Sequence, residues 1–204
     1  MNIAAIGITI SIVSLGISLW TLWVTKVKKG NIKFTKPNVI YFGPDGQSSN
    51  QKKFFIRTLM YSTSERGKYI EDMYAKIWQN GRPQIFNIWV YGDKDLLRGS
   101  GLFVDKKGIA TNLHFLLPAN ETTYEYNHGS YKIEIYVQTT DKKPKKVLEE
   151  DLKITEEQSS LMKIKNWGLY FDWDTNSQEY FAHPRGKSDE LELIQNLLEI
   201  KDKK

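Results

Sequence analysis

The chain has 204 residues, a net charge of +5 at pH 7 and no cysteine. The absence of cysteine excludes cysteine nucleophiles and zinc sites built from cysteine clusters. About 150 residues lie between an N-terminal apolar segment and the last predicted helix, enough for one domain with a real core. We therefore expect a short apolar segment followed by a single domain at residues 30–186.

The first predicted element is a transmembrane helix. Residues 3–24 contain no charged side chain, and about 20 apolar residues suffice to cross a bilayer. A cleaved signal peptide would carry its basic residues before the apolar core and small residues after it. Here the basic residues follow the core, and Trp20 and Trp23 stand where small residues would be needed. The sequence predicts an uncleaved anchor and basic flank at residues 1–29.

The basic flank also predicts the orientation of the span. Lys and Arg are retained on the cytoplasmic side of a membrane. The residues before the span carry no basic side chain, whereas Lys26, Lys28 and Lys29 follow it directly. We expect a single-pass protein of the cell inner membrane, with its N-terminus outside and its domain in the cytoplasm.

A stripe of small and hydroxyl-bearing residues runs along the predicted helix. Its spacing alternates between three and four residues, and its members are Ala4, Gly7, Ser11, Ser14, Ser18 and Thr21. Small side chains let two helix backbones approach, so the stripe predicts contact with a second copy of the chain or with another membrane protein. The alternative is that the hydroxyl groups bond to their own helix backbone and are merely tolerated.

The rest of the chain predicts a mainly β domain. Segments rich in Ile, Val, Phe, Tyr and Trp are separated by turn sequences such as Asn80-Gly81. Many short strands at this spacing favour an antiparallel sandwich or barrel. The predicted strands are residues 31–34, 39–42, 53–62, 68–79, 83–91, 102–104, 109–117, 131–139 and 145–154.

Two helices are predicted within and after this domain. Thr155-Glu156-Glu157-Gln158 has the pattern of a capping box and predicts a short inserted helix that ends near Lys163. Residues 187–204 have acidic residues at their start, lysines at their end and a helical apolar face. This last segment predicts a C-terminal amphipathic helix.

One motif resembles a known family. Asn127-x-Gly129-x-Tyr131, followed by Ile133, is similar to the tyrosine corner of immunoglobulin-like β-sandwiches. The resemblance implies that Tyr131 opens strand F and that its hydroxyl bonds to nearby backbone. It also implies that residues 131–139 and 145–154 are strands F and G. Such a fold does not by itself assign a function.

Basic residues gather in predicted turns, at Lys106, Lys107, Lys142, Lys143, Lys145 and Lys146. In an immunoglobulin-like sandwich these turns share the end from which the first strand starts. Together with the basic flank they would face the anionic cytoplasmic leaflet. The alternative is that they serve ordinary solubility. A nucleic-acid partner is disfavoured, because the basic runs are not interleaved with aromatic residues.

Candidate contacts for a protein partner are Trp89, Tyr91, Trp167 and Trp173, because Trp and Tyr commonly anchor interfaces. The preferred interpretation of residues 167–174 is nevertheless a core strand that closes the sandwich.

No catalytic residue, cofactor or metal site is predicted. The three histidines, His114, His128 and His183, lack metal-ligand spacing. Ser100 lacks the glycine two residues earlier that a nucleophile elbow needs. We expect a non-catalytic, membrane-anchored adaptor that docks a protein partner. The alternative is an oligomerising effector that permeates the bilayer through the helix stripe, and a third is an enzyme whose site is assembled by the fold.

Overall fold

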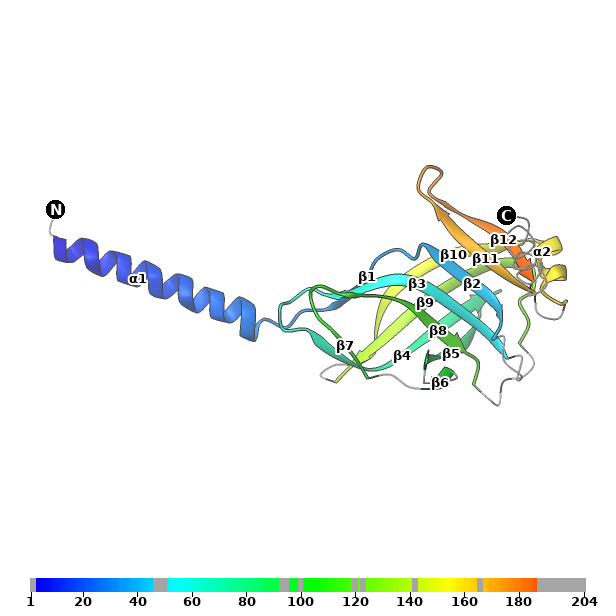
Figure 1. The fold of residues 1–204 in the computed structure, drawn as a ribbon, viewed down its shortest axis with the longest axis horizontal. Coiled ribbons are helices and arrows are strands. Elements are labelled where there is room, and N and C mark those ends of the chain that lie inside the picture. The colour runs from blue at the N-terminus through cyan, green and yellow to red at the C-terminus, as the bar shows by residue number, and fades with distance from the viewer. Residues whose placement is uncertain are drawn as a thin grey trace, which may run out of the picture.

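The computed structural model describes residues 3–45, 51–91, 96–98, 101–118, 121, 124–140, 143–164 and 167–186. The predicted C-terminal helix at residues 187–204 and the predicted basic residue Lys142 lie outside these ranges. An N-terminal helix projects from one end of a mainly β domain (Figure 1). The helical elements are α1 (Ile3–Leu22), the π-helical segment η1 (Trp23–Val27) and α2 (Glu156–Leu161).

The strands are antiparallel and vary from short to long. They are β1 (Ile32–Phe34), β2 (Val39–Pro44), β3 (Lys52–Ser62), β4 (Lys68–Gln79), β5 (Arg82–Tyr91), β6 (Leu96–Arg98), β7 (Leu102–Val104), β8 (Ile109–Leu116), β9 (Gly129–Thr139), β10 (Lys145–Ile154), β11 (Trp167–Asp174) and β12 (Glu179–Gly186).

The helix α1 is apolar along its whole length and none of its residues is buried. It therefore does not pack on the β domain as the core helix of a soluble protein would. Among the described residues, one helical stretch, Ile3–Val27, is long and apolar enough to cross a membrane.

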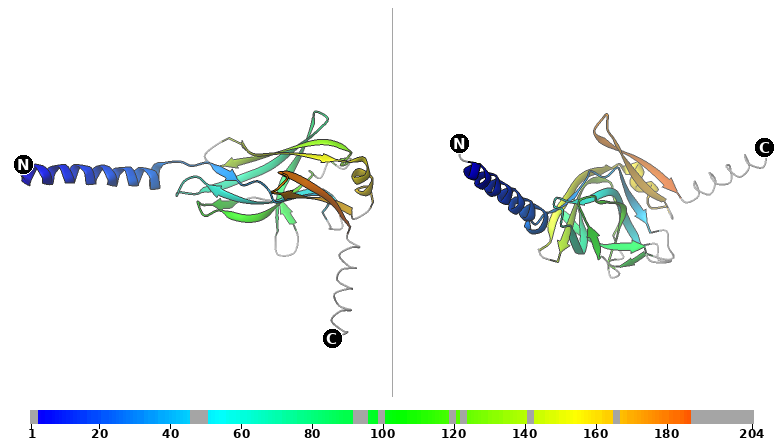
Figure 2. Two further views of the ribbon diagram at one scale, coloured as in Figure 1. Left: turned by 90° about the horizontal axis from the view of Figure 1, so that it is seen from above. Right: turned by 60° about the vertical axis from the view of Figure 1, so that its left-hand side comes forward.

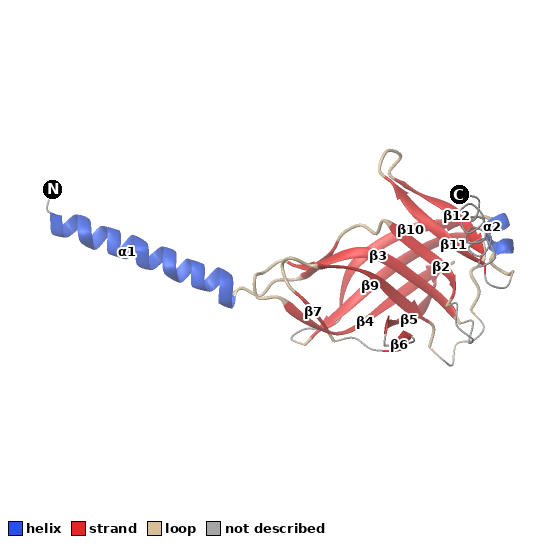
Figure 3. Ribbon diagram, viewed as in Figure 1, coloured by secondary structure: helices blue, strands red, loops and turns tan. Residues whose placement is uncertain are grey.

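Within the described chain, 12 strands pair in one antiparallel sheet with the order β10-β9-β4-β5-β8-β3-β2-β11-β12. Three short strands join its sides: β1 pairs with β3, β6 with β5 and β7 with β4. The sheet curls on itself into a near-barrel (Figures 2 and 3). The predicted division into two separate sheets is not seen in the pairing, because β5 pairs with β4 through Asn87 and also with β8 through Ile88 and Trp89.

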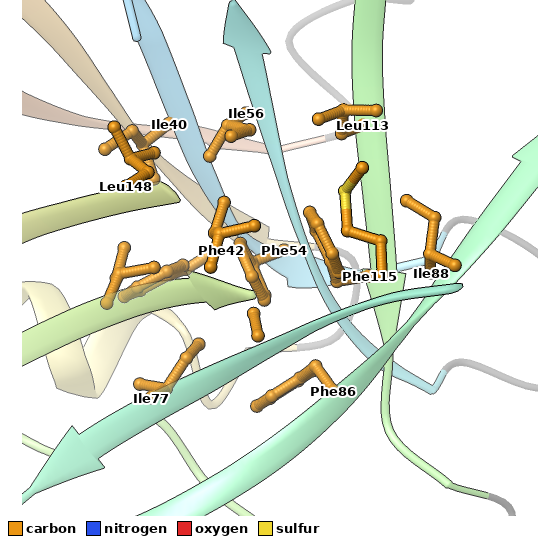
Figure 4. Packing of buried hydrophobic residues seen from close by; sticks show 14 of the residues in the cluster. Ile40, Phe42, Phe54, Ile56, Ile77, Phe86, Ile88, Leu113, Phe115 and Leu148 are labelled. Carbon is orange, nitrogen blue, oxygen red and sulfur yellow. The ribbon is translucent and has the colours of Figure 1, made fainter. Parts of the chain in front are cut away.

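The core lies inside the curl and follows from the alternation of apolar residues along each strand (Figure 4). Phe54 and Phe115 stack with ring centroids 4.8 Å apart, and Phe42 meets Phe54 edge to face. Each of these rings is fully buried, which contributes about 1.5–3 kcal/mol per side chain relative to exposure.

Tyr131 makes the contact that the family resemblance implied. It lies near the start of β9, and its hydroxyl donates a 2.5 Å hydrogen bond to the backbone carbonyl of Asn127. Its ring packs edge to face on Phe42 in the core. The predicted hydroxyl–backbone bond is therefore confirmed.

The capping box is also confirmed, with a shorter helix behind it. The Thr155 hydroxyl accepts from the backbone of Gln158, and the Gln158 side chain accepts from the backbone of Thr155. The helix α2 ends at Leu161 rather than near Lys163. Ser159 is buried and donates to the carbonyl of Tyr126, which fixes α2 to the end of the barrel.

The strand β12 was not predicted. It forms a hairpin with β11 at the margin of the sheet, and most of its residues are exposed. Pro184 interrupts its pattern, as proline does on edge strands. The aromatic segment β11 is a strand that pairs with β2, as the preferred interpretation expected.

Candidate functional site

A groove opens where the curled sheet fails to close. Ile32 of β1 and Val147 of β10 line one small cavity near the helix-bearing end, so the two margins of the sheet approach each other there. Farther along, β2 pairs with β11, and the β11–β12 hairpin stands away from β10 (Figure 1). The gap between β10 and this hairpin forms an open cavity.

We call this cavity the hairpin groove. Its volume is about 1080 Å³, and it is lined by Lys36, Trp78, Asn80, Gly81, Ser130, Tyr131, Lys132, Glu149, Glu150, Asp151, Leu152, Lys153, Phe171, Trp173, Gln178, Glu179 and Tyr180. The lining comes from the β4–β5 turn, β9, β10 and the hairpin, so it exists only in the folded chain.

Lys36 joins the two walls of the hairpin groove. Its ammonium lies 2.9 Å from a carboxylate oxygen of Glu150 on β10. The same ammonium lies 3.9 Å from the ring centroid of Trp173 on β11 and 5.4 Å from that of Tyr180 on β12. A cation over aromatic faces is attracted by about 0.5–2 kcal/mol. Lys36 therefore holds the hairpin at a fixed distance from β10.

Tyr180 strengthens the same junction. Its hydroxyl donates a 2.9 Å hydrogen bond to the carbonyl of Pro37, and its ring meets Trp173 edge to face. Burial, followed by the nearby charge of Glu150, raises the pKa of Tyr180 above its ordinary value. The hydroxyl thus stays protonated and remains a donor at physiological pH.

The floor of the hairpin groove is apolar. Tyr131, Leu152 and Phe171 reach it from β9, β10 and β11, and each is buried against the core. A partner that enters the groove would meet the half-buried ring of Trp173 above this floor. Apolar floors with a few polar groups at the rim are typical of binding clefts.

Trp78 is oriented at one end of the hairpin groove by a charged network. Its indole N–H donates a 2.8 Å hydrogen bond to Glu134, which also accepts from Lys146 and Tyr136. Burial acts to raise the pKa of Glu134, but the hydrogen bonds from Lys146, Trp78 and Tyr136 outweigh it and leave that pKa lowered. Glu134 therefore remains ionised and keeps Trp78 in place.

The strand β10 supplies a free edge along this groove. It stands at one end of the strand order, and its described partner strand is β9 alone. Residues 149–153 lie in the groove, a length of about 17 Å in an extended strand. An edge strand presents a row of backbone N–H and C=O groups that can pair with another extended segment.

The charges around the hairpin groove are mixed. Lys36 pairs with Glu150, and Lys132 lies 3.1 Å from Glu149. Asp151 and Lys153 are exposed along the same edge. The electrostatics therefore do not select a strongly acidic or basic ligand, and recognition here would rest on backbone pairing and apolar contact.

The four predicted partner-binding aromatics do not form one cluster. Trp173 lies in the hairpin groove. Trp167 lies at the other end of the hairpin, where it packs against Gly186, its partner in register. Trp89 pairs with His114 on the opposite side of the sheet, and Tyr91 ends β5 next to β6.

Trp89 belongs to a row of rings on the outer face of the sheet. Its members are partners in register from β5 to β12 and are Trp89, His114, Phe55, Tyr41, Tyr170 and His183. Tyr41 stacks on Phe55 with ring centroids 5.1 Å apart, and Tyr170 stacks on His183 at 5.6 Å. Such cross-strand aromatic pairs stabilise a sheet, which gives the row a structural role.

The helix stripe remains on the exposed surface of α1. Its hydroxyl groups bond within the helix: Ser11 donates to Gly7, Ser18 to Ser14 and Thr21 to Ile17. Ala4 and Gly7 are also exposed on the helix. A side chain added at Gly7 would meet no atom within 4 Å. The stripe is thus open to a partner, and the hydroxyl groups of Ser11, Ser18 and Thr21 are satisfied without one.

The predicted basic turns gather at the end of the domain that carries α1 (Figure 1). Lys107, Lys143 and Lys145 are exposed there, and the flank residues Lys26, Lys28 and Lys29 are exposed as well. Two of the predicted residues have carboxylate partners. Lys106 lies 2.5 Å from Glu65, and Lys146 contacts both Glu134 and Glu149.

Most residues that shape the hairpin groove have no signal in the sequence. Lys36, Glu150 and Tyr180 are far apart in sequence and carry no motif. The one available signal was the aromatic segment that contains Trp173. Comparison with protein-family models and with curated proteins gives no match for this chain.

Proposed function

We propose that this protein is a membrane-anchored, non-catalytic binding module whose hairpin groove takes an extended segment of a partner protein. The observation that carries the proposal is the free edge of β10 along a groove with an apolar floor and a charged rim. In this mode the partner's backbone would pair with residues 149–153, and its alternate side chains would pack between Trp173 and the groove floor.

Anchoring by α1 is part of the proposal. An apolar helix with no buried residue, followed by Lys26, Lys28 and Lys29, favours insertion with the domain on the cytoplasmic side of the inner membrane. A reporter that works only in the cytosol, fused after Lys204, should be active. Activity of a periplasm-only reporter at that position would contradict this orientation.

We further propose that the domain is a variant of the immunoglobulin-like sandwich. Support comes from the strand order β10-β9-β4-β5 and β8-β3-β2, which matches G-F-C-C′ and E-B-A of that fold. The hydroxyl bond of Tyr131 also supports it. In this interpretation β5 links the two sheets, and the β11–β12 hairpin is an addition beside strand A.

The effector alternative has no specific observation in its favour. The hydroxyl groups of Ser11, Ser18 and Thr21 already bond to their own helix, so they do not require a water-filled path. The stripe fits a helix–helix contact with a second copy or with another membrane protein at least as well as it fits a pore through the bilayer.

The binding proposal is tested by selecting ligands for the groove. A library of random heptapeptides displayed on phage is selected against the full chain in nanodiscs, and the selected peptides are titrated against variants. Trp173→Ala should weaken binding by about 30-fold or more, the range of an aromatic hot spot.

Trp89→Ala is the matched control, because it makes the same change on the outer face of the sheet. It should leave affinity for the selected peptides unchanged. The proposal fails if the library yields no ligand, or if the selected peptides lose affinity for Trp89→Ala and keep it for Trp173→Ala. Thermal denaturation of both variants identifies any loss of folding.

A further inference from the structure

The end of the domain next to α1 is built from three turns. The β3–β4 turn meets the β7–β8 turn through a 2.8 Å hydrogen bond from the Ser62 backbone to that of Asp105. The β9–β10 turn joins them, since the Thr140 backbone donates to Tyr69 at 3.4 Å. We call this surface the helix-proximal end.

A short, fixed junction holds this end close to the apolar helix. Residues 28–30 separate η1 from the domain and can span about 10 Å at most. Asn31 donates to the Thr63 hydroxyl at 2.8 Å, and the Thr63 backbone donates back to Asn31 at 3.0 Å. Gly30 is packed so closely that a side chain there would lie 2.6 Å from the backbone nitrogen of Ser64. The domain therefore cannot swing far from the end of the span.

Two aromatic rings are exposed at the helix-proximal end. Tyr69 on β4 and Phe103 on β7 are partners in register, with ring centroids 4.8 Å apart. Tyr69 is 61% exposed and Phe103 is 44% exposed. Gly67, at a φ of +67°, makes room for Phe103, since a side chain there would lie 2.4 Å from the ring. The pair is thus fixed in place while it faces solvent.

Basic residues surround this aromatic pair. Lys29, Arg66 and Lys68 line a small pocket of about 180 Å³ together with the two rings. Lys107 and Lys143 are exposed on the neighbouring turns. Aromatic rings flanked by cations match the headgroup region of an anionic bilayer, where rings sit at the interface and lysines meet phosphate groups.

We infer that the helix-proximal end is a second membrane contact, in which Tyr69 and Phe103 enter the interface of an anionic leaflet beside the span. Solubility would explain the lysines but not the exposed ring pair among them. The contact would fix the orientation of the domain on the membrane and turn the hairpin groove, at the far end, toward the cytosol. The inference rests on the proposed anchoring by α1.

The chain has no cysteine, so a single introduced cysteine can carry one nitroxide label. Thr140→Cys places the label at the helix-proximal end, and Thr175→Cys places it in the exposed β11–β12 turn as a control. The full chain is placed in nanodiscs of phosphatidylcholine, with or without phosphatidylglycerol. Electron paramagnetic resonance measures access to oxygen, which concentrates in lipid, and to a water-soluble nickel chelate.

With phosphatidylglycerol present, the label at residue 140 should gain access to oxygen and lose access to nickel, while the label at residue 175 stays in water. Tyr69→Ser with Phe103→Ser should abolish this change. The double variant Lys107→Glu, Lys143→Glu should reduce this change in the accessibility of the label at residue 140. Both lysines are exposed, so these substitutions should leave the fold intact.

Two results would overturn the inference. One is a label at residue 140 that stays as water-exposed as the label at residue 175 in both bilayers. The other is equal lipid contact with and without phosphatidylglycerol. A chain that fails to enter nanodiscs at all would instead overturn the anchoring on which the inference rests, so the two failures are distinguishable.

Discussion

The ammonium of Lys36 lies 3.9 Å from the ring centroid of Trp173. Because the same ammonium pairs with Glu150 at 2.9 Å, one side chain links the protruding hairpin to the free edge strand. The width of the hairpin groove therefore depends on Lys36, together with Tyr180, between two elements that do not pair with each other in the described sheet.

Lys36→Met should destabilise the domain while it keeps the aliphatic part of the side chain. It removes the cation beside Glu150, which is only 8% exposed, and an unpaired buried charge costs about 1–3 kcal/mol or more. Denaturant unfolding of the full chain in detergent measures the loss. Adding Glu150→Gln should restore part of the lost stability, because the unpaired carboxylate is then removed. If Lys36→Met alone has the same denaturation midpoint as the wild type, the Lys36–Glu150 pair contributes nothing to stability.

Tyr131→Phe should lower the free energy of unfolding by about 0.5–1.5 kcal/mol, because the carbonyl of Asn127 loses the Tyr131 hydroxyl and keeps the donor from Gln79. The same unfolding measurement applies. Tyr136→Phe removes a hydroxyl that bonds to Glu134 at 3.0 Å on the outer face and should cost less. Equal costs for the two variants would argue against a special role for Tyr131 at the start of β9.

His114 should make the domain acid-sensitive. Burial, helped by the charge of Lys53, lowers the pKa of His114 to about 4, against about 6.5 in an unfolded chain. As pH falls from about 6.5 toward 4, the unfolded chain binds a proton that the folded chain does not, so the free energy of unfolding decreases across that window and levels off below it. Stability above pH 6.5 should not depend on this group.

His114→Gln should flatten this pH dependence, because glutamine does not titrate. His128→Gln makes the same change in the exposed turn before β9 and serves as the control. Denaturation midpoints measured across the window test the prediction, and a slope in His114→Gln as steep as in the wild type would refute it.

Ser14→Leu should disrupt self-association of α1, because a bulky side chain holds two helix backbones apart. Ile12→Leu, off the stripe, is the control. A membrane two-hybrid assay should lose signal for the first variant alone. If both variants behave alike, the stripe makes no helix–helix contact and its polar residues are merely tolerated. The hydrogen bond from Ser18 to Ser14 within the helix is consistent with that outcome.

Local patterns in the sequence predicted the parts of this fold that depend on local interactions. The predicted strand at residues 131–139 is β9, and its alternating apolar residues Ile133, Ile135 and Val137 are buried. The capping box predicted α2, since its bonds span only a few residues. The apolar run predicted the exposed helix α1 for the same reason.

Features that depend on distant pairing could not be predicted in this way. The hairpin groove arises because β2, which pairs with β3 on one side, pairs with β11 on its other side and not with β10, an arrangement set by packing over the whole sheet. In the sequence, Tyr69 and Phe103 are ordinary residues of two separate predicted strands. Only the register between β4 and β7 brings them together.

The central claim, that β10 pairs with an extended segment of a partner, is tested most directly by hydrogen exchange. Amide exchange of the full chain in nanodiscs is measured with and without a peptide selected from the phage library. Pairing of a bound peptide with β10 should slow exchange in residues 149–153, with no change in β5 around Trp89. Protection confined to β5 or to the outer face, with β10 unaffected by bound peptide, would contradict it.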